Sequence, residues 1–221
     1  MDGRAVAEYA AAVSVSEIRQ RLASNLARVE RLISASDGFG SDAESDLIKS
    51  DMLRAAVVFL HATLEDLLRS GLELQLPRAR PEQLGGILFV VEDDRGETRK
   101  REKLSLTELT QYRGQTVDDT IKDVVVKHLD RSNFNNIEEI GAATRRMGIS
   151  GLRELGLDHH AEDLIALTSR RHWIVHRVDR NPRPSAEEPE TREIRVSTVT
   201  VWKNCVEAVC AGILDALEQK S

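Results

Sequence analysis

The chain has 221 residues, of which 41% are hydrophobic and 31% charged, and its formal net charge is −6 at pH 7. This length allows a sizeable core, and the balance of apolar and charged residues is typical of a globular protein, not of a disordered one. The acidic charge argues against a protein that coats nucleic acid non-specifically. No apolar run approaches the ~18 residues of a membrane span, and no secretory signal is evident, so we expect a cytoplasmic protein without membrane contact.

The first two predicted elements are long helices. Apolar residues recur every three or four positions between residues 4 and 34, and again between residues 41 and 76, where Pro77 ends the pattern. Residues 34–40 are rich in Ser, Asp and Gly and form the connecting loop. The pattern indicates an antiparallel helical pair.

Residues 77–104 differ in character from what precedes them. Pro77, Pro81 and the Gly85-Gly86 pair interrupt helix, and residues 87–91 form a short strand-like run. Residues 93–96 suit a turn, after which residues 99–104 return as the second half of a hairpin. We expect an insert between helices here, not a second domain.

The rest of the chain is again helical. Helices are expected over 106–112, 117–130, 136–147 and 158–177, with a last one from about residue 197. The residues placed to cap or open them are Ser105, Thr116, Asn136, Asp158, and either Ser197 or Thr198. The sequence thus predicts an all-α helical bundle, a single domain over residues 1–221, with a small irregular or β-hairpin insert at about 77–104.

Cys205 and Cys210 lie five positions apart on the last predicted helix. That spacing points them ~140° apart, so neither a disulfide nor shared metal ligation is expected within the helix. Buried free thiols are the interpretation that the spacing favours.

The segment Arg171-His172-Trp173-Ile174-Val175-His176 ends the helix predicted over 158–177. At ~100° per residue, Arg171 falls in the middle of an apolar stripe and Trp173 falls on the polar face. A charge on an apolar face and a tryptophan on a polar one are departures of the kind that mark functional sites. The apolar stripe consists of Leu157, Ala161, Leu164, Thr168 and Val175.

This Arg-x4-His segment, together with the helix of residues 57–65 that contains Glu65, resembles HEPN-domain ribonucleases of the RiboL-PSP type. The resemblance implies a helical bundle with metal-independent endoribonuclease activity, working as a homodimer whose two motifs face each other. It also implies a toxin or antiviral defence effector, with a cognate antitoxin or inhibitor protein as partner. A family subgroup has a tyrosine two positions after the motif histidine that a partner enzyme modifies. Here that position is Val178, so this form of control is not expected.

RNA cleavage through the 2′-hydroxyl needs a base, an acid and a cation for the phosphate, and no cofactor or metal. We assign proton transfer to His176, the phosphate charge to Arg171, and to His172 a second proton transfer or an orienting role. Glu65 is expected to pair with Arg171, because an arginine on a core-facing stripe needs a partner. The arginines expected to bind RNA around the motif are Arg170, Arg177 and Arg180.

Other interpretations remain open from the sequence. Arg171 suits a structural ion pair, and His176 suits a cation at a helix C-terminus. His172 and His176 have the spacing of zinc ligands, although no third ligand is evident. Trp173 is expected to pack against another helix or a second subunit. The chain as a whole also suits a catalytically inactive HEPN-like module that binds a partner protein or a nucleotide.

Overall fold

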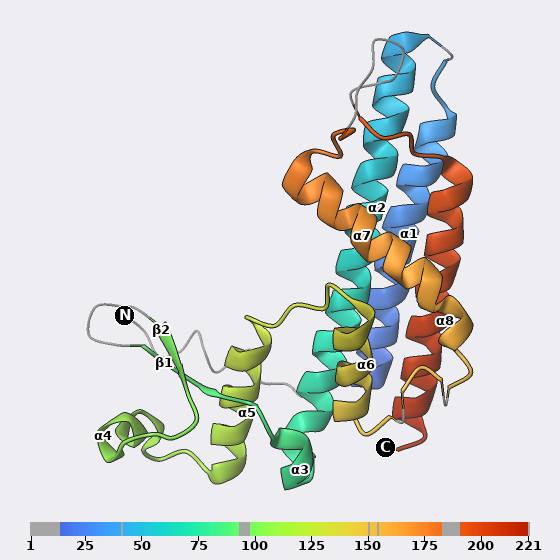
Figure 1. Ribbon diagram of the computed structural model, residues 1–221. Helices are drawn as coiled ribbons and strands as arrows, with labels where there is room; N and C mark the ends of the chain where they lie inside the picture. The colour runs from blue at the N-terminus through green and yellow to red at the C-terminus, as the bar shows by residue number, and fades with distance from the viewer. Residues whose placement is uncertain are drawn as a thin grey trace.

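The computed structural model describes residues 14–40, 42–92, 98–149, 151–153, 155–182 and 191–220. Its main body is a bundle in which α1 (Val15–Asp37), α2 (Ala43–Gln75) and α8 (Val196–Glu218) run side by side, and α7 (Ala161–Arg177) crosses them obliquely (Figure 1). The predicted all-α bundle with a small hairpin is therefore confirmed. Within the described residues, no helix combines the length and apolarity needed to cross a bilayer.

The two long helices begin at capping residues. Ser14 accepts the backbone N–H of Glu17, whose carboxylate accepts the Ser14 N–H in return, so α1 starts with a capping box. Asp42 caps α2 through the backbone N–H of Ser45. The predicted start of the first helix, residues 4–13, lies outside the described residues. The helix itself continues to Asp37, three residues beyond the predicted end.

The core lies between these helices and follows the predicted spacing. Gly71 of α2 lies where a helix interior would ordinarily favour alanine. A Cβ there would come within 2.7 Å of Met147 Sδ and 3.5 Å of Leu217 Cδ1, so glycine permits a close approach of neighbouring elements. Fully or almost fully buried apolar residues of α1, α2 and α8 include Ile18, Val29, Leu60, Leu64, Leu67, Val206 and Ile213.

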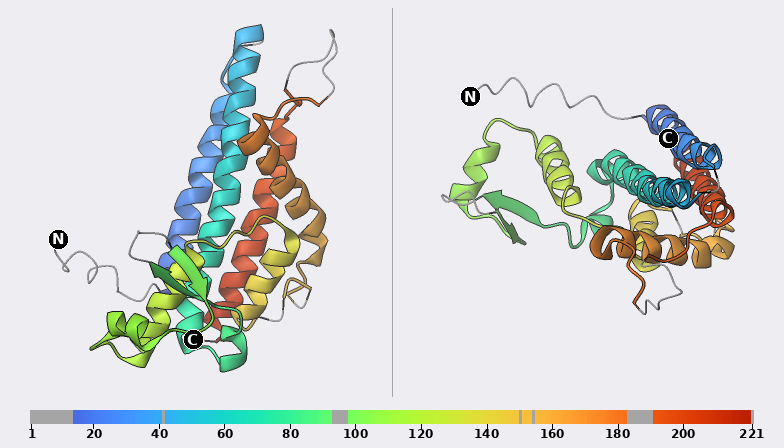
Figure 2. Two further views of the ribbon diagram at one scale, coloured as in Figure 1. Left: turned by 60° about the vertical axis from the view of Figure 1, so that its left-hand side comes forward. Right: turned by 90° about the horizontal axis from the view of Figure 1, so that it is seen from above.

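The insert forms a small unit beside one end of the bundle (Figures 1 and 2). It contains α3 (Pro81–Leu84), an antiparallel hairpin of β1 (Phe89–Glu92) and β2 (Thr98–Arg101), and α4 (Leu106–Leu109) with the 3-10 turn η3 (Thr110–Tyr112). The hairpin prediction is confirmed, but its turn at residues 93–96 lies outside the described residues. The unit extends beyond residue 104, because α5 (Val117–Leu129) packs against both β1 and α2.

The chain returns to the bundle through α6 (Ile137–Arg146) and the 3-10 turn η4 (Asp158–His160), which leads directly into α7. Ser105, Thr116 and Asn136 all cap the helices predicted for them. The predicted cap of the last helix is wrong. The N-cap is Arg195, and the helix starts at Val196, so Ser197 and Thr198 lie inside its first turn.

Candidate functional site

The motif occupies the last turns of α7, which buries Leu164, Leu167 and Thr168 against the bundle. The buried stripe continues through half-buried Arg171 and through Ile174, which packs on the core. Arg171 therefore lies between Thr168 and Ile174 on the core-facing stripe, where the spacing predicts it, but it is only half-buried. Val175 was predicted to belong to the same stripe, but it is 46% exposed, because the stripe passes through Ile174 instead.

Arg171 points toward α2 and the segment before α6. Its Nη1 donates to the side-chain oxygen of Asn135 at 3.5 Å, a long hydrogen bond. Its charge also acts on His61 of α2, which is only 1% exposed. The pKa of His61 lies below its ordinary value, mainly because burial disfavours the charged ring and further because of Arg171, while the nearby Glu65 carboxylate opposes the shift.

Glu65 of α2 also lies beside His61, but it does not pair directly with Arg171. Its carboxylate lies 3.7 Å from Nδ1 of His61 and accepts the backbone N–H of Phe134 at 3.4 Å. Within the described residues Arg171 and Glu65 form no ion pair, so the predicted direct contact is wrong, and His61 lies in contact with Glu65 instead. The sequence-based reasoning gave His61 no role, although its position four residues before Glu65 places both on one side of α2.

His172 and His176 are exposed on the outer side of α7. Their rings are neighbours, with centroids 4.7 Å apart and planes inclined by 47°. Arg177 and Arg180 follow, also exposed. The end of α7 thus presents two imidazoles and two guanidinium groups to solvent.

Arg170 has a different environment from the one predicted. Its Nη2 donates to the Asp179 carboxylate at 2.7 Å and to the backbone oxygens of Arg192 and Glu193 at 3.0 and 2.9 Å. Arg54 of α2 donates from Nε to the same carboxylate at 2.9 Å. Asp179 is fully buried, so Arg170 belongs to an internal ion-pair cluster and is withdrawn from the predicted RNA-binding set.

Trp173 is half-buried and packs against the segment before α8, whereas the sequence predicted packing against another helix or a second subunit. The guanidinium of Arg192 lies 4.0 Å from the centroid of its ring, a cation–π contact. The segment that leads into α8 therefore covers this side of α7. This contact favours a packing role for Trp173 over base stacking.

The arrangement can do two things chemically. The exposed imidazoles can donate and accept protons in a reaction, and the arginines can bind phosphate oxygens. Metal binding by the motif gains no support, because no third His, Cys, Asp or Glu among the described residues joins His172 and His176 at ligand distance. Comparison of the chain with family models, curated proteins and solved structures found no match. The HEPN resemblance therefore stays a prediction based on the motif residues.

Proposed function

We propose that the chain is a metal-independent endoribonuclease of HEPN type that cleaves RNA by attack of the RNA's own 2′-hydroxyl. One observation carries the proposal: the last two turns of α7 carry an exposed pair of neighbouring histidines and, toward α2, a half-buried arginine. The long hydrogen bond from Arg171 to Asn135 leaves guanidinium donors for a phosphate. A role as toxin or defence effector, held in check by an inhibitor protein, follows from the resemblance alone.

Each motif residue has a separate task. Either His176 or His172 takes the proton of the 2′-hydroxyl, and a second imidazole gives a proton to the departing 5′-oxygen. Arg171 binds the non-bridging oxygens as charge develops on them. The expected products carry a 2′,3′-cyclic phosphate and a 5′-hydroxyl. Arg177 and Arg180 bind the flanking phosphates.

The geometry of α7 favours a homodimer. Arg171 and His176 are five positions apart, which is about 140° around a helix, so one motif does not aim both groups at one phosphate. Two motif helices related by a two-fold axis bring the arginine of one subunit toward the histidines of the other. The outer side of α7 offers a contact for this purpose, because Ile165, seven positions before His172, is 49% exposed.

The test is cleavage of a mixed RNA pool in excess EDTA by the wild-type protein, Arg171→Ala and His176→Ala. His159→Ala is the matched control, because His159 is an exposed histidine in η4, the 3-10 turn that leads into the opposite end of α7. We expect wild type and control to cleave and both motif variants to lose cleavage by at least about 100-fold. Retained RNA binding without any cleavage by wild type would favour the inactive binding module. Cleavage that both variants retain would contradict the proposal.

A further inference from the structure

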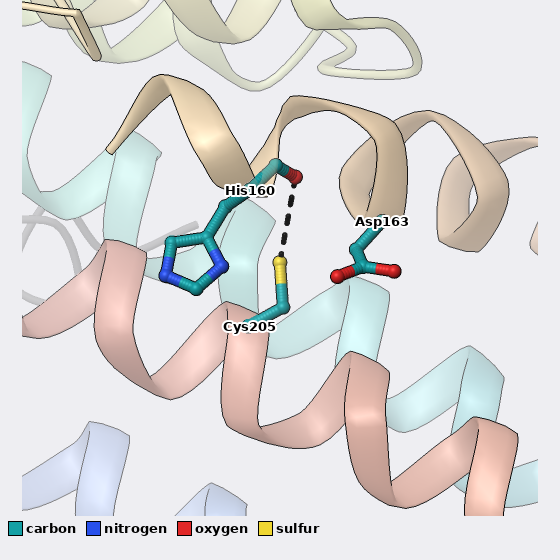
Figure 3. A group of neighbouring side chains, drawn as sticks. All are labelled: His160, Asp163 and Cys205. Atoms are coloured by element: carbon teal, nitrogen blue, oxygen red, sulfur yellow. Dashed lines mark hydrogen bonds between the residues drawn. The ribbon is translucent and has the colours of Figure 1, made fainter. Parts of the chain in front are cut away.

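A second group of reactive side chains lies at the other end of α7 (Figure 3). His160 ends η4, Asp163 lies in the first turn of α7, and Cys205 faces them from the middle of α8. One ligand atom from each residue, a ring nitrogen, a carboxylate oxygen and Sγ, lies within 4.8 Å of the other two. His160 and His172 are twelve residues apart, or about 18 Å along a helix, so the ribonuclease motif does not use this group.

The set of donors matches one class of metal ion. Imidazole nitrogen, carboxylate oxygen and thiolate sulfur are the three ligand types of Zn²⁺, whereas Mg²⁺ and Ca²⁺ select oxygen ligands. Bond lengths of about 2.0–2.3 Å in a tetrahedral site hold the ligand atoms about 3.5 Å apart. The side chains therefore need to close by about 1 Å, a change that small adjustments of their torsion angles provide.

The surroundings of Cys205 argue against a nucleophilic role for the same three residues. Cys205 is only 2% exposed, and its Sγ donates a hydrogen bond to the backbone oxygen of His160 at 3.7 Å (Figure 3). Burial, and secondarily the Asp163 carboxylate, raises the pKa of the thiol to about 12. A Cys–His–Asp nucleophile needs the opposite, a thiol with a depressed pKa.

The half-buried His160 ring offers a nitrogen donor from the end of η4, next to the ligand atoms of the other two residues. A divalent cation between the groups would also offset the repulsion between the Asp163 carboxylate and a Cys205 thiolate.

We propose that His160, Asp163 and Cys205 form a Zn²⁺ site that joins the start of α7 to the middle of α8. Three protein ligands leave one tetrahedral position for water. The bound ion fixes the first turn of α7, the helix whose last two turns carry Arg171 and the histidine pair. The site stands on contacts of its own and does not depend on the proposed ribonuclease activity.

The test measures metal binding by the full chain after removal of metal with a chelator. Zn²⁺ is titrated in competition with a chromophoric chelator, and Co²⁺ is used as a spectroscopic substitute. We expect one ion per chain, a thiolate-to-cobalt charge-transfer band, and a Tm that rises with Zn²⁺ concentration. Cys205→Ala and His160→Ala should weaken binding by at least about 100-fold, since loss of even an outer-shell partner costs 10–100-fold.

Cys210→Ala and His159→Ala are the matched controls, because Cys210 is a buried thiol on the same helix and His159 is the adjacent imidazole. Both should bind Zn²⁺ like wild type. Asp163→Asn replaces Cys205→Ala if that variant does not fold. Wild type that takes up no stoichiometric Zn²⁺, or ligand variants that bind as wild type does, would overturn the site. An RNA assay of His160→Ala separates the two proposals, because the motif and its activity in EDTA should survive this change.

Discussion

Arg54 and Asp179, which lie 125 positions apart in the chain, are joined by a hydrogen-bonded ion pair of 2.9 Å. The carboxylate is fully buried and also accepts from Arg170 of α7 at 2.7 Å. Two guanidinium groups from different helices thus share one carboxylate directly after the motif. The cluster fixes the end of α7 against α2.

Asp179→Asn should lower the free energy of unfolding by about 3–5 kcal/mol, because it removes the buried counter-charge that two largely buried guanidinium groups share. Asparagine tolerates the backbone here, where φ is 54°, so the effect reports the charge and not the turn. The measurement is the urea midpoint at neutral pH. Asp51→Asn is the control: Asp51 also pairs with Arg54, but its side chain is 81% exposed, and its loss should cost less than about 1 kcal/mol. Equal losses in both variants would contradict the cluster's role.

Val178→Gly should stabilise the protein. Val178 ends α7 in the left-handed region with φ at 51°, where a β-branched side chain is strained and glycine is favoured. The side chain is 79% exposed, so little packing is lost. We expect a gain of about 0.5–1 kcal/mol, or roughly 1–4 °C in Tm. Val201→Gly, in the interior of α8, should do the opposite. A lower Tm for Val178→Gly would show that the strain is not relieved.

His61 should make stability dependent on pH. Its folded-state pKa lies below the ordinary 6.5, because burial and Arg171 outweigh Glu65. The ring is neutral in both states well above pH 6.5. As pH falls through that value, the unfolded chain takes up a proton that the folded chain refuses, so stability declines, by at most about 1.4 kcal/mol per pH unit.

The measurement is urea unfolding from pH 7.5 down to pH 5 for wild type and His61→Gln. The difference in slope isolates His61, since every other histidine is present in both proteins. The variant should lose less stability than wild type over this interval. Parallel curves would show that His61 titrates alike in both states.

Mixing two inactive variants should restore part of the proposed ribonuclease activity. A heterodimer of Arg171→Ala and His176→Ala has one site in which the intact arginine of one subunit meets the intact histidines of the other. Random exchange of subunits then gives roughly a quarter of wild-type cleavage. The measurement is RNA cleavage after co-refolding in equal amounts. The Arg171→Ala variant refolded alone is the control, and no recovery in the mixture would place both groups in one subunit.

The helices follow from local information in the sequence. Ser105, Thr116 and Asn136 cap the predicted helices because a side-chain oxygen and the N–H groups of the next turn are neighbours in sequence. The predicted cap of α8 is wrong, because the observed cap, Arg195, lies two or three positions before Ser197 and Thr198. The chain directly before the helix is held by a distant residue, since Arg170 of α7 donates to the backbone oxygens of Arg192 and Glu193, and no local capping signal reports such a contact.

The sequence by itself determined the all-α class, the hairpin, the two buried thiols and the placement of His172 and His176 on one side of a helix, since each depends on periodicity or short spacing. Only the tertiary structure decided which arginines are free of internal ion pairs and which are bound inside the molecule. Arg170 and Arg171 are adjacent, yet one is bound to Asp179 inside the molecule and the other lies beside His61. It also brought Cys205 to His160, 45 positions away. The physical reason is that partners of buried charges and thiols come from distant helices, whose packing no local pattern specifies.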